Sequence, residues 1–302
     1  MRLFAASHHG AAVHRQAAVF EALGFELDHP DASFKPRLKG YQPDPGLPGR
    51  LVSWDTFCAT RYDVLVIECF EQIATYLANL RPQHPGAALV WYAGNNNVVR
   101  AYPTDRVKNL IAADVQSYYS TRAPNKVRFY PPVLTDPRIP AAPPPAPPQL
   151  SLCSLVNHHE RFWPQAWALA LRLREQLNPI PVNLYGEGAP LGPRSPHEAL
   201  PAHSALLHAK PKDGFGFAVA EALCYGRPVV MPYAWTRNKT MADYLIDGKT
   251  AILFFHEDEA VQRVRALYDD PGWGTRCRAK AQEFFNLERA VGALRPFFEN
   301  LH

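Results

Sequence analysis

Short apolar runs alternate with stretches of helical spacing along most of the chain. An apolar run bounded by turn residues predicts a buried strand, and apolar residues three or four positions apart predict a helix. The strands predicted in the first half are Arg2–Ser7, Phe25–Leu27, Asp63–Glu68, Ala88–Tyr92, Asp114–Ser117 and Val127–Tyr130. The helices predicted there are Ala11–Leu23, Gln72–Leu80 and Val107–Ala113, and Asp31–Arg50 is predicted to be loop because it is rich in Pro and Gly.

The same alternation resumes after residue 150. The predicted strands are Leu150–Val156, Val182–Tyr185, Ala205–Ala209, Pro228–Pro232 and Ala251–Phe254. The predicted helices are Pro164–Gln176, Phe217–Tyr225, Glu257–Leu267, Thr275–Phe285 and Leu287–Leu301. Continuous apolar strands between helices are typical of parallel sheets that are covered on both faces, so the pattern predicts an α/β protein with two such sheets.

A proline-rich segment separates the two halves. Nine of the eighteen residues from 131 to 148 are proline, which excludes a helix interior or a central strand. We interpret residues 134–149 as an extended linker between residues 1–133 and residues 150–286, with a surface loop inside one domain as the alternative. Residues 287–302 then form a final helix.

Composition and charge narrow the class of protein. No run of eighteen apolar residues occurs, so we expect no membrane span, and the first residues resemble a strand and not a signal peptide. The five cysteines are far apart and contain no Cys-x-x-Cys, which favours a reducing cytoplasm over a disulfide or zinc framework. The net charge of +4 permits a phosphate-bearing partner without requiring one.

The segment that contains the strongest candidates for binding and catalytic residues is KPKDGFGFAVAEALCYGRPVVM, residues 210–231. A Gly-rich turn opening a helix directs backbone N–H groups and the positive end of the helix dipole at an anion such as phosphate. Asp213 lies in the turn, and Glu221 lies in the helix among apolar residues. A carboxylate there needs donors, and sugar or ribose hydroxyls would supply them.

These residues resemble the acidic-x7-acidic motif of retaining GT-B glycosyltransferases, the glycogen-synthase-like and sucrose-synthase-like group. That motif usually reads EGFGLPVLEAMACGTPVV. The segments VNLYGEG (182–188), DGKTAIL (247–253) and NLER (286–289) also resemble segments of that group. The resemblance implies two Rossmann-like domains facing across a cleft. Residues 1–133 would be the acceptor side, residues 150–286 would bind a nucleotide-diphosphate-sugar, and residues 287–302 would be a closing helix that crosses back to the first domain.

The resemblance also implies roles for matching residues. Glu221 would bind the ribose hydroxyls, and Asp213 the hydroxyls of the transferred sugar. The backbone from Gly214 through Phe215 and Gly216 to Phe217 would contact sugar or diphosphate, and Gly186, Glu187 and Gly188 would lie beside the base and diphosphate. Asp213 stands where Glu is commoner, which leaves the donor sugar open.

Two other family features are replaced. The family's basic pair after the first strand of the second domain gives way to Asn157–Arg161, so Arg161, Lys210, Lys212 or His158 would neutralise the leaving diphosphate. A histidine after a strand of the first domain gives way to Asn95–Asn97, and we name Asn95 and Asn96 as acceptor-side candidates.

The loop after the first predicted strand contains His8, His9 and Gly10. We expect it to line the acceptor side, with His9 as a candidate catalytic base beside Asp213 and Glu221. His8, His9 and His14 lack a nearby acidic or cysteine partner, so we expect no metal there. The resemblance to GT-B enzymes implies a reaction without a metal or another cofactor.

The function that this resemblance implies is transfer of a sugar from a nucleotide-diphosphate-sugar to an acceptor hydroxyl with retention of configuration. The acceptor stays open between a saccharide, a small molecule and a DNA base. A glycosyltransferase acting on a modified DNA base is one alternative, because the chain is short and mildly basic. A non-catalytic sugar-nucleotide-binding protein is another.

Overall fold

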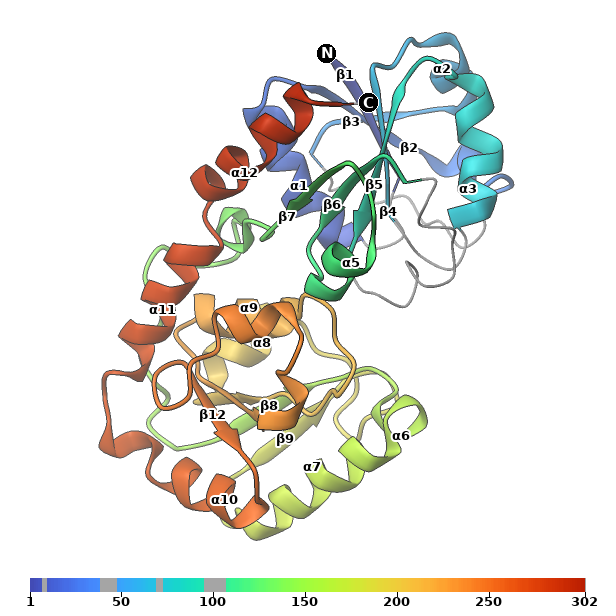
Figure 1. The fold of residues 1–302 in the computed structure, drawn as a ribbon. Helices are drawn as coiled ribbons and strands as arrows, with labels where there is room; N and C mark the ends of the chain where they lie inside the picture. The colour runs from blue at the N-terminus through green and yellow to red at the C-terminus, as the bar shows by residue number, and fades with distance from the viewer. Residues whose placement is uncertain (7–9, 39–47, 69–72, 95–106, 302) are drawn as a thin grey trace. The chain divides into compact units, whose positions relative to one another are not determined.

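The computed structural model describes residues 1–6, 10–38, 48–68, 73–94 and 107–301. The chain divides into two compact units (Figure 1). Unit 1 contains Met1–Thr135 together with Asn286–His302, and unit 2 contains Asp136–Phe285. Each unit is built around one parallel sheet.

The sheet of unit 1 has the order β3-β2-β1-β4-β5-β6-β7 in the described residues. Its strands are β1 (Arg2–Ala6), β2 (Glu26–Pro30), β3 (Arg50–Val52), β4 (Val64–Glu68), β5 (Ala88–Ala93), β6 (Asn109–Ala112) and β7 (Asn125–Arg128). Its helices are α1 (Gly10–Ala22), α2 (Trp54–Ala59), α3 (Ile73–Leu80), α5 (Val115–Ser120) and α12 (Leu287–Glu299).

Helices cover both faces of this sheet. On one face Phe57 of α2 and Tyr76 of α3 pack with Phe4 and Leu65 in a buried cluster. On the other side of the unit α12 lies against α1 (Figure 1), and the ring of Phe298 is 5.8 Å from that of Phe20. The apolar strands are buried from both sides, which is why they carry no polar alternation.

The sheet of unit 2 has the order β12-β11-β10-β8-β9 in the described residues. Its strands are β8 (Leu152–Leu155), β9 (Val182–Tyr185), β10 (Ala205–Leu207), β11 (Val229–Pro232) and β12 (Ala251–Phe254). Its helices are α6 (His159–Phe162), α7 (Pro164–Gln176), α8 (Pro196–Ala199), α9 (Phe217–Cys224), α10 (Glu257–Arg265) and α11 (Trp273–Phe284).

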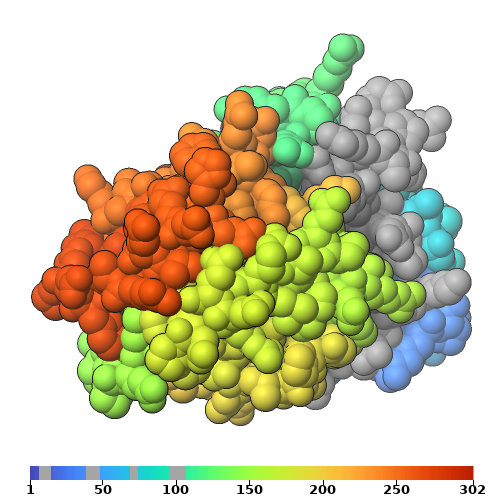
Figure 2. All heavy atoms as spheres, turned by 90° about the horizontal axis from the view of Figure 1, so that it is seen from below, coloured from blue at the N-terminus to red at the C-terminus, as the bar shows by residue number. Residues whose placement is uncertain are grey.

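Helices α7 and α10 cover one face of this sheet, where Leu169 and Val264 join the core with Leu207 and Ile252. Figure 2 shows the outer surface on this side, where side chains of α7 (yellow-green) lie beside those of the 251–285 region (orange). Arg172 of α7 and Glu257 of α10 form an ion pair of 2.7 Å there. Helix α9 packs on β10 and β11 and against α11.

The proline-rich segment after residue 135 belongs to unit 2. Buried arginines hold its backbone: Arg227 donates to the carbonyl of Pro145 at 2.8 Å, and Arg278 donates to those of Pro140 and Ala141. Proline carbonyls remain good acceptors although proline has no N–H donor, so the segment is fastened to the unit through its carbonyl groups.

Two predictions in the first half are wrong. Residues 107–113, predicted to be a helix, contain strand β6, and Asp114–Ser117, predicted to be a strand, lies at the start of α5. The run Asn109–Ala112 is buried between β5 and β7, which outweighs its helical spacing. The Asp114 carboxylate accepts from the Ser117 amide and caps α5. Strand β3, which begins at the end of the predicted loop Asp31–Arg50, and helices α2, α6 and α8 were not predicted.

Candidate functional site

The strand order of unit 2 reverses beside β8. From β8 the chain runs through α7 to β9 on one side, and it then returns to β10 on the other side. Ligands of open parallel sheets bind at such a switch point, outside the carboxyl ends of the strands. The segments that follow the two strands at this point are residues 156–159 after β8 and residues 208–216 after β10.

The turn into α9 is fixed from within unit 2. Gly216 caps the helix with φ of 78°, and a Cβ atom there would lie 3.1 Å from the Met241 Cε. Phe215 is buried, and its carbonyl accepts a hydrogen bond of 2.6 Å from the Tyr244 hydroxyl. The first-turn N–H groups of a helix have no intrahelical acceptor, so this turn presents donors at a defined place.

Asp213 lies in this turn between two basic side chains. Its Oδ1 is 3.3 Å from the Lys210 Nζ, and its Oδ2 is 3.1 Å from the His208 Nε2. Burial opposes the charge of this carboxylate, but Lys210 and His208 outweigh burial and hold the pKa of Asp213 well below its usual value. The side chain is 17% exposed, so the carboxylate still reaches the surface.

His208 was missed by the sequence analysis. It follows β10 directly and is buried, and its amide donates to the carbonyl of Val230. One signal for it was present in the sequence: His208 is the single polar residue in the apolar run Ala205–Ala209, and that run predicts a strand. A second buried histidine, His159 of α6, lies close enough to interact with His208, and burial lowers the pKa of His159.

Glu221 lies in the fifth position of α9 and is 5% exposed. It interacts electrostatically with Tyr225, one turn further along, and with Arg138, whose pKa is raised mainly by its hydrogen bond to Asp136. The Arg138 side chain is 60% exposed, and its two short side-chain hydrogen bonds go to Asp136. Arg138 therefore acts on Glu221 through its charge, while its forked donors are directed at Asp136.

The loops after β8 and β9 are fastened together. The Glu187 amide donates to Asn157 Oδ1 at 3.0 Å, and the His158 Nε2 lies 2.9 Å from Glu187 Oε2. Gly186 has φ of 138°, and a Cβ atom there would lie 2.3 Å from the Val156 carbonyl oxygen. Only glycine permits this approach of the two backbones. Gly188 also has a positive φ and lies beside the His158 ring.

The other predicted donor residues are more peripheral. Arg161 is exposed on α6, with its guanidinium 5.2 Å from the Phe162 ring. Lys212 is exposed, whereas Lys210 is half-buried against Asp213. Lys239 donates to the carbonyl of Pro211 and so anchors the loop between these two lysines. The geometry therefore brings Lys210, and not Arg161 or Lys212, into contact with a predicted acidic residue.

The acceptor-side candidates in the first half are mostly outside the described residues. This applies to His8, His9, Asn95 and Asn96, while Gly10 begins α1. In the part of the chain that the structure describes, no three His, Cys, Asp or Glu side chains gather as a metal site. No helix among the described residues is long and apolar enough to cross a membrane.

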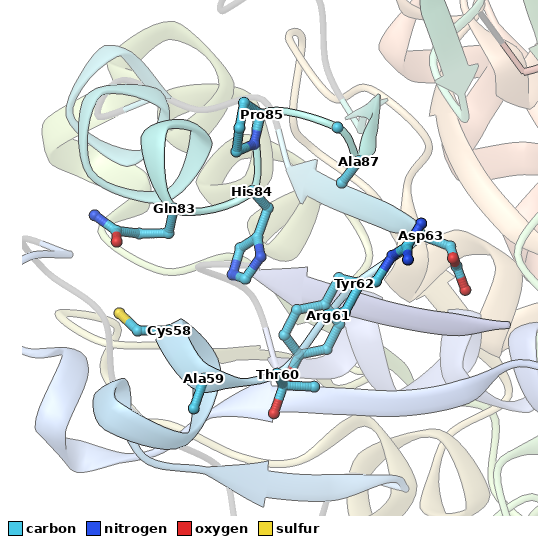
Figure 3. A pocket seen from close by; sticks show the side chains of 11 residues that line it. Cys58, Ala59, Thr60, Arg61, Tyr62, Asp63, Gln83, His84, Pro85 and Ala87 are labelled. Atoms are coloured by element: carbon cyan, nitrogen blue, oxygen red, sulfur yellow. The ribbon is translucent and has the colours of Figure 1, made fainter.

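Unit 1 has a hollow of about 430 Å³ between residues 58–63 and 83–87 (Figure 3). His84 points into it, with its ring edge-on to Phe57 at 4.3 Å. Both segments immediately precede strands, β4 and β5, so the hollow lies at the end of the sheet where strands begin. That is the edge opposite to the one where parallel sheets bind ligands.

No family model and no curated protein matches the sequence. Solved structures do match the fold. A glycosyltransferase from Rickettsia africae ESF-5 is similar with a TM-score of 0.62 and 10% identity, over 99% of this chain and 97% of that chain. The lipopolysaccharide outer core galactosyltransferase WaaB, in its apo form, is similar with a TM-score of 0.61 and 12% identity, over 99% and 100%.

A third similar structure is a mutant of S. aureus TarM in complex with Fondaparinux, alpha-GlcNAc-glycerol and UDP. It has a TM-score of 0.60 and 13% identity, and the match covers 78% of this chain. The match spans 55% of TarM, so this chain corresponds to only part of that protein. Together these likenesses confirm the predicted fold: the chain has the α/β GT-B fold, with its two parallel sheets.

Proposed function

We propose that the protein transfers a sugar from a nucleotide-diphosphate-sugar to an acceptor hydroxyl with retention of configuration. The observation that carries this proposal is the pair of acidic residues at the entrance of α9. Asp213 precedes the first turn and Glu221 follows it, at the switch point of a sheet with the GT-B fold. Each has the burial and the charged neighbours expected of a binding carboxylate.

The donor's parts are assigned to separate groups. The first-turn N–H groups of α9 and the ammonium of Lys210 face the diphosphate. Glu221 accepts hydrogen bonds from the ribose hydroxyls, and Asp213 accepts them from the hydroxyls of the sugar. The loop Gly186–Gly188 lies beside the base. UDP is the first nucleotide to test, because the TarM structure holds UDP.

The reaction breaks the bond between the anomeric carbon and the phosphate oxygen and forms one from that carbon to the acceptor oxygen on the same face. The leaving phosphate oxygen takes the acceptor's proton. The protein's part is to hold preorganised donors and a cation against the departing diphosphate. We propose no metal in this step, and activity in excess EDTA tests that point.

Calorimetry with UDP and other nucleoside diphosphates tests the donor site. Glu221→Gln weakens UDP binding by about tenfold or more, since a hydrogen bond to a charged group is worth about 1.5–3 kcal/mol. Glu283→Gln is the matched control, because Glu283 lies on α11 and pairs with Lys280 on the surface. If Glu221→Gln binds UDP as tightly as the wild type does, the assignment of Glu221 to the donor site is wrong. If the wild type binds no nucleotide, the proposed function is wrong.

Product analysis tests the chemistry. The anomeric configuration of the product, read by NMR against that of the donor, distinguishes retention from inversion. Binding of UDP-sugars with neither hydrolysis nor transfer would favour a non-catalytic binding protein. Salt-sensitive binding to duplex DNA would favour a DNA base as acceptor, and no binding at low salt would exclude it.

A further inference from the structure

His208 stands out among the buried histidines of unit 2. It is the first residue after β10, its side chain is 3% exposed, and its amide is held by the Val230 carbonyl at 3.0 Å. Its Nε2 lies 3.1 Å from the Oδ2 of Asp213. A rigid strand end therefore places this imidazole on the inner side of the carboxylate.

Asp213 has a basic side chain beside each carboxylate oxygen. Lys210 donates a hydrogen bond of 3.3 Å to Oδ1, and the buried His208 Nε2 lies 3.1 Å from Oδ2, at an angle outside hydrogen-bond geometry. Each carboxylate oxygen has a second lone pair, and these are the ones left for a ligand. Because the side chain is only 17% exposed, the directions in which it accepts are limited. Its two partners therefore set the plane of the carboxylate.

Among the described residues, the titratable groups beside His208 include Asp213, with Lys210 beyond it, and His159 from α6, whose pKa burial lowers. His159 is thus neutral near pH 7 and does not compete for Asp213 as a cation. His208 therefore lies against this carboxylate from the buried side.

We propose that His208 is a positioning residue that aims Asp213 at the hydroxyls of the transferred sugar. It contributes to the affinity for the sugar part of the donor and not to that for the nucleotide. This inference rests on the proposed function. It goes further by separating the two parts of the donor, with Glu221 serving the nucleotide and the His208–Asp213 pair the sugar.

The opposite end of the same strand supplies a matched control. His203 lies two residues before β10 and is also buried, but its ring bonds the Ala199 carbonyl at 2.7 Å and the Asn183 amide at 2.8 Å. It therefore supports the fold at the end where the strand begins. Substitution of either histidine removes a buried imidazole beside one end of β10, and of the two only His208 faces the proposed sugar site.

The experiment measures the dissociation constants of UDP and of UDP-glucose, UDP-galactose and UDP-N-acetylglucosamine with the full chain. The sugar increment is the ratio of the UDP constant to that of the best UDP-sugar. His208→Leu lowers this increment by about tenfold and leaves UDP affinity within about twofold. This is the effect expected when a sugar hydroxyl loses one well-aligned hydrogen bond to the Asp213 carboxylate. His208→Gln, which keeps a donor near the Nε2 position, restores most of the increment. His203→Leu leaves it unchanged.

The outcomes separate the inference from the function beneath it. A wild type that binds no UDP overturns both. A wild type that binds UDP, with His208→Leu keeping the full sugar increment or losing UDP and UDP-sugar affinity equally, overturns the inference and leaves the proposed function standing. A wild type without a sugar increment overturns the inference too. If His208→Leu does not fold, an increment in His208→Gln at or below one tenth of that of the wild type overturns it as well.

Discussion

The two ends of the strands in unit 2 use buried polar side chains in opposite ways. Where the strands begin, Arg227 donates to the carbonyls of Leu200, Pro145 and Pro201, and His203 bonds the Ala199 carbonyl. Where they end, His208 meets a carboxylate, that of Asp213. A side chain whose donors are bonded to backbone carbonyls stabilises the fold, whereas the partly exposed Asp213 carboxylate keeps lone pairs for a ligand.

Arg227→Ala tests the structural end and gives the largest effect. Three carbonyls, that of buried Leu200 among them, lose a donor from a buried guanidinium, so the free energy of unfolding falls by about 3 kcal/mol. Urea unfolding measures this change. UDP affinity, measured at a temperature where the variant is folded, stays as in the wild type. If Arg227→Ala lost UDP affinity and kept its stability, the assignment of a structural role to the end where the strands begin would be wrong.

Asp213→Asn tests the charged end and gives an intermediate effect. Because the folded pKa of Asp213 is depressed, its ionised form stabilises the fold above the unfolded pKa of about 3.9, and this contribution is lost as pH falls through the folded pKa. At pH 7 the variant loses about 1–2 kcal/mol, the scale of a hydrogen bond to a charge. Urea unfolding as a function of pH shows the gap narrowing below about pH 4. A gap that stays constant down to pH 2 would contradict the charge pairing.

Gly216→Ala gives the smallest effect on stability. A residue with a Cβ atom at φ of 78° loses about 1 kcal/mol, and the new atom would crowd Met241. Gly248→Ala is the control, since Gly248 has φ of 71° and a Cβ atom there would meet nothing within 4 Å. Thermal unfolding occurs at a lower temperature in both variants. UDP affinity falls only in Gly216→Ala. An equal change of UDP affinity in both variants would show that the turn at Gly216 is not part of the donor site.

Most elements were predictable because the strands are buried on both faces and the helices end at recognisable residues. Gly24 and Gly226, each just past a helix, have positive φ, as C-terminal glycines should. The run 107–117 was not predictable, because a short apolar run suits either a buried strand or a helix. Its pairing with β5 and β7 decided the outcome.

The proposed site was predictable only where its residues are close in sequence. Asp213, Glu221 and the glycines between them lie within a single turn and helix, so their spacing carried the prediction. His208 was hidden near the end of an apolar run. The interaction of Glu221 with Arg138 joins residues that are far apart in the sequence, and no local pattern signals it.

Helix α12 has a consequence for how the protein is made. Its Phe298 packs with Phe20 and Phe25, and the Asn125 side chain bonds the carbonyls of Phe297 and Asn300. This helix leaves the ribosome after all of Asp136–Phe285, although the residues that it covers are made before that segment. Unit 2 is therefore specified by one continuous stretch of chain, while Met1–Thr135 stays partly uncovered until α12 has been translated.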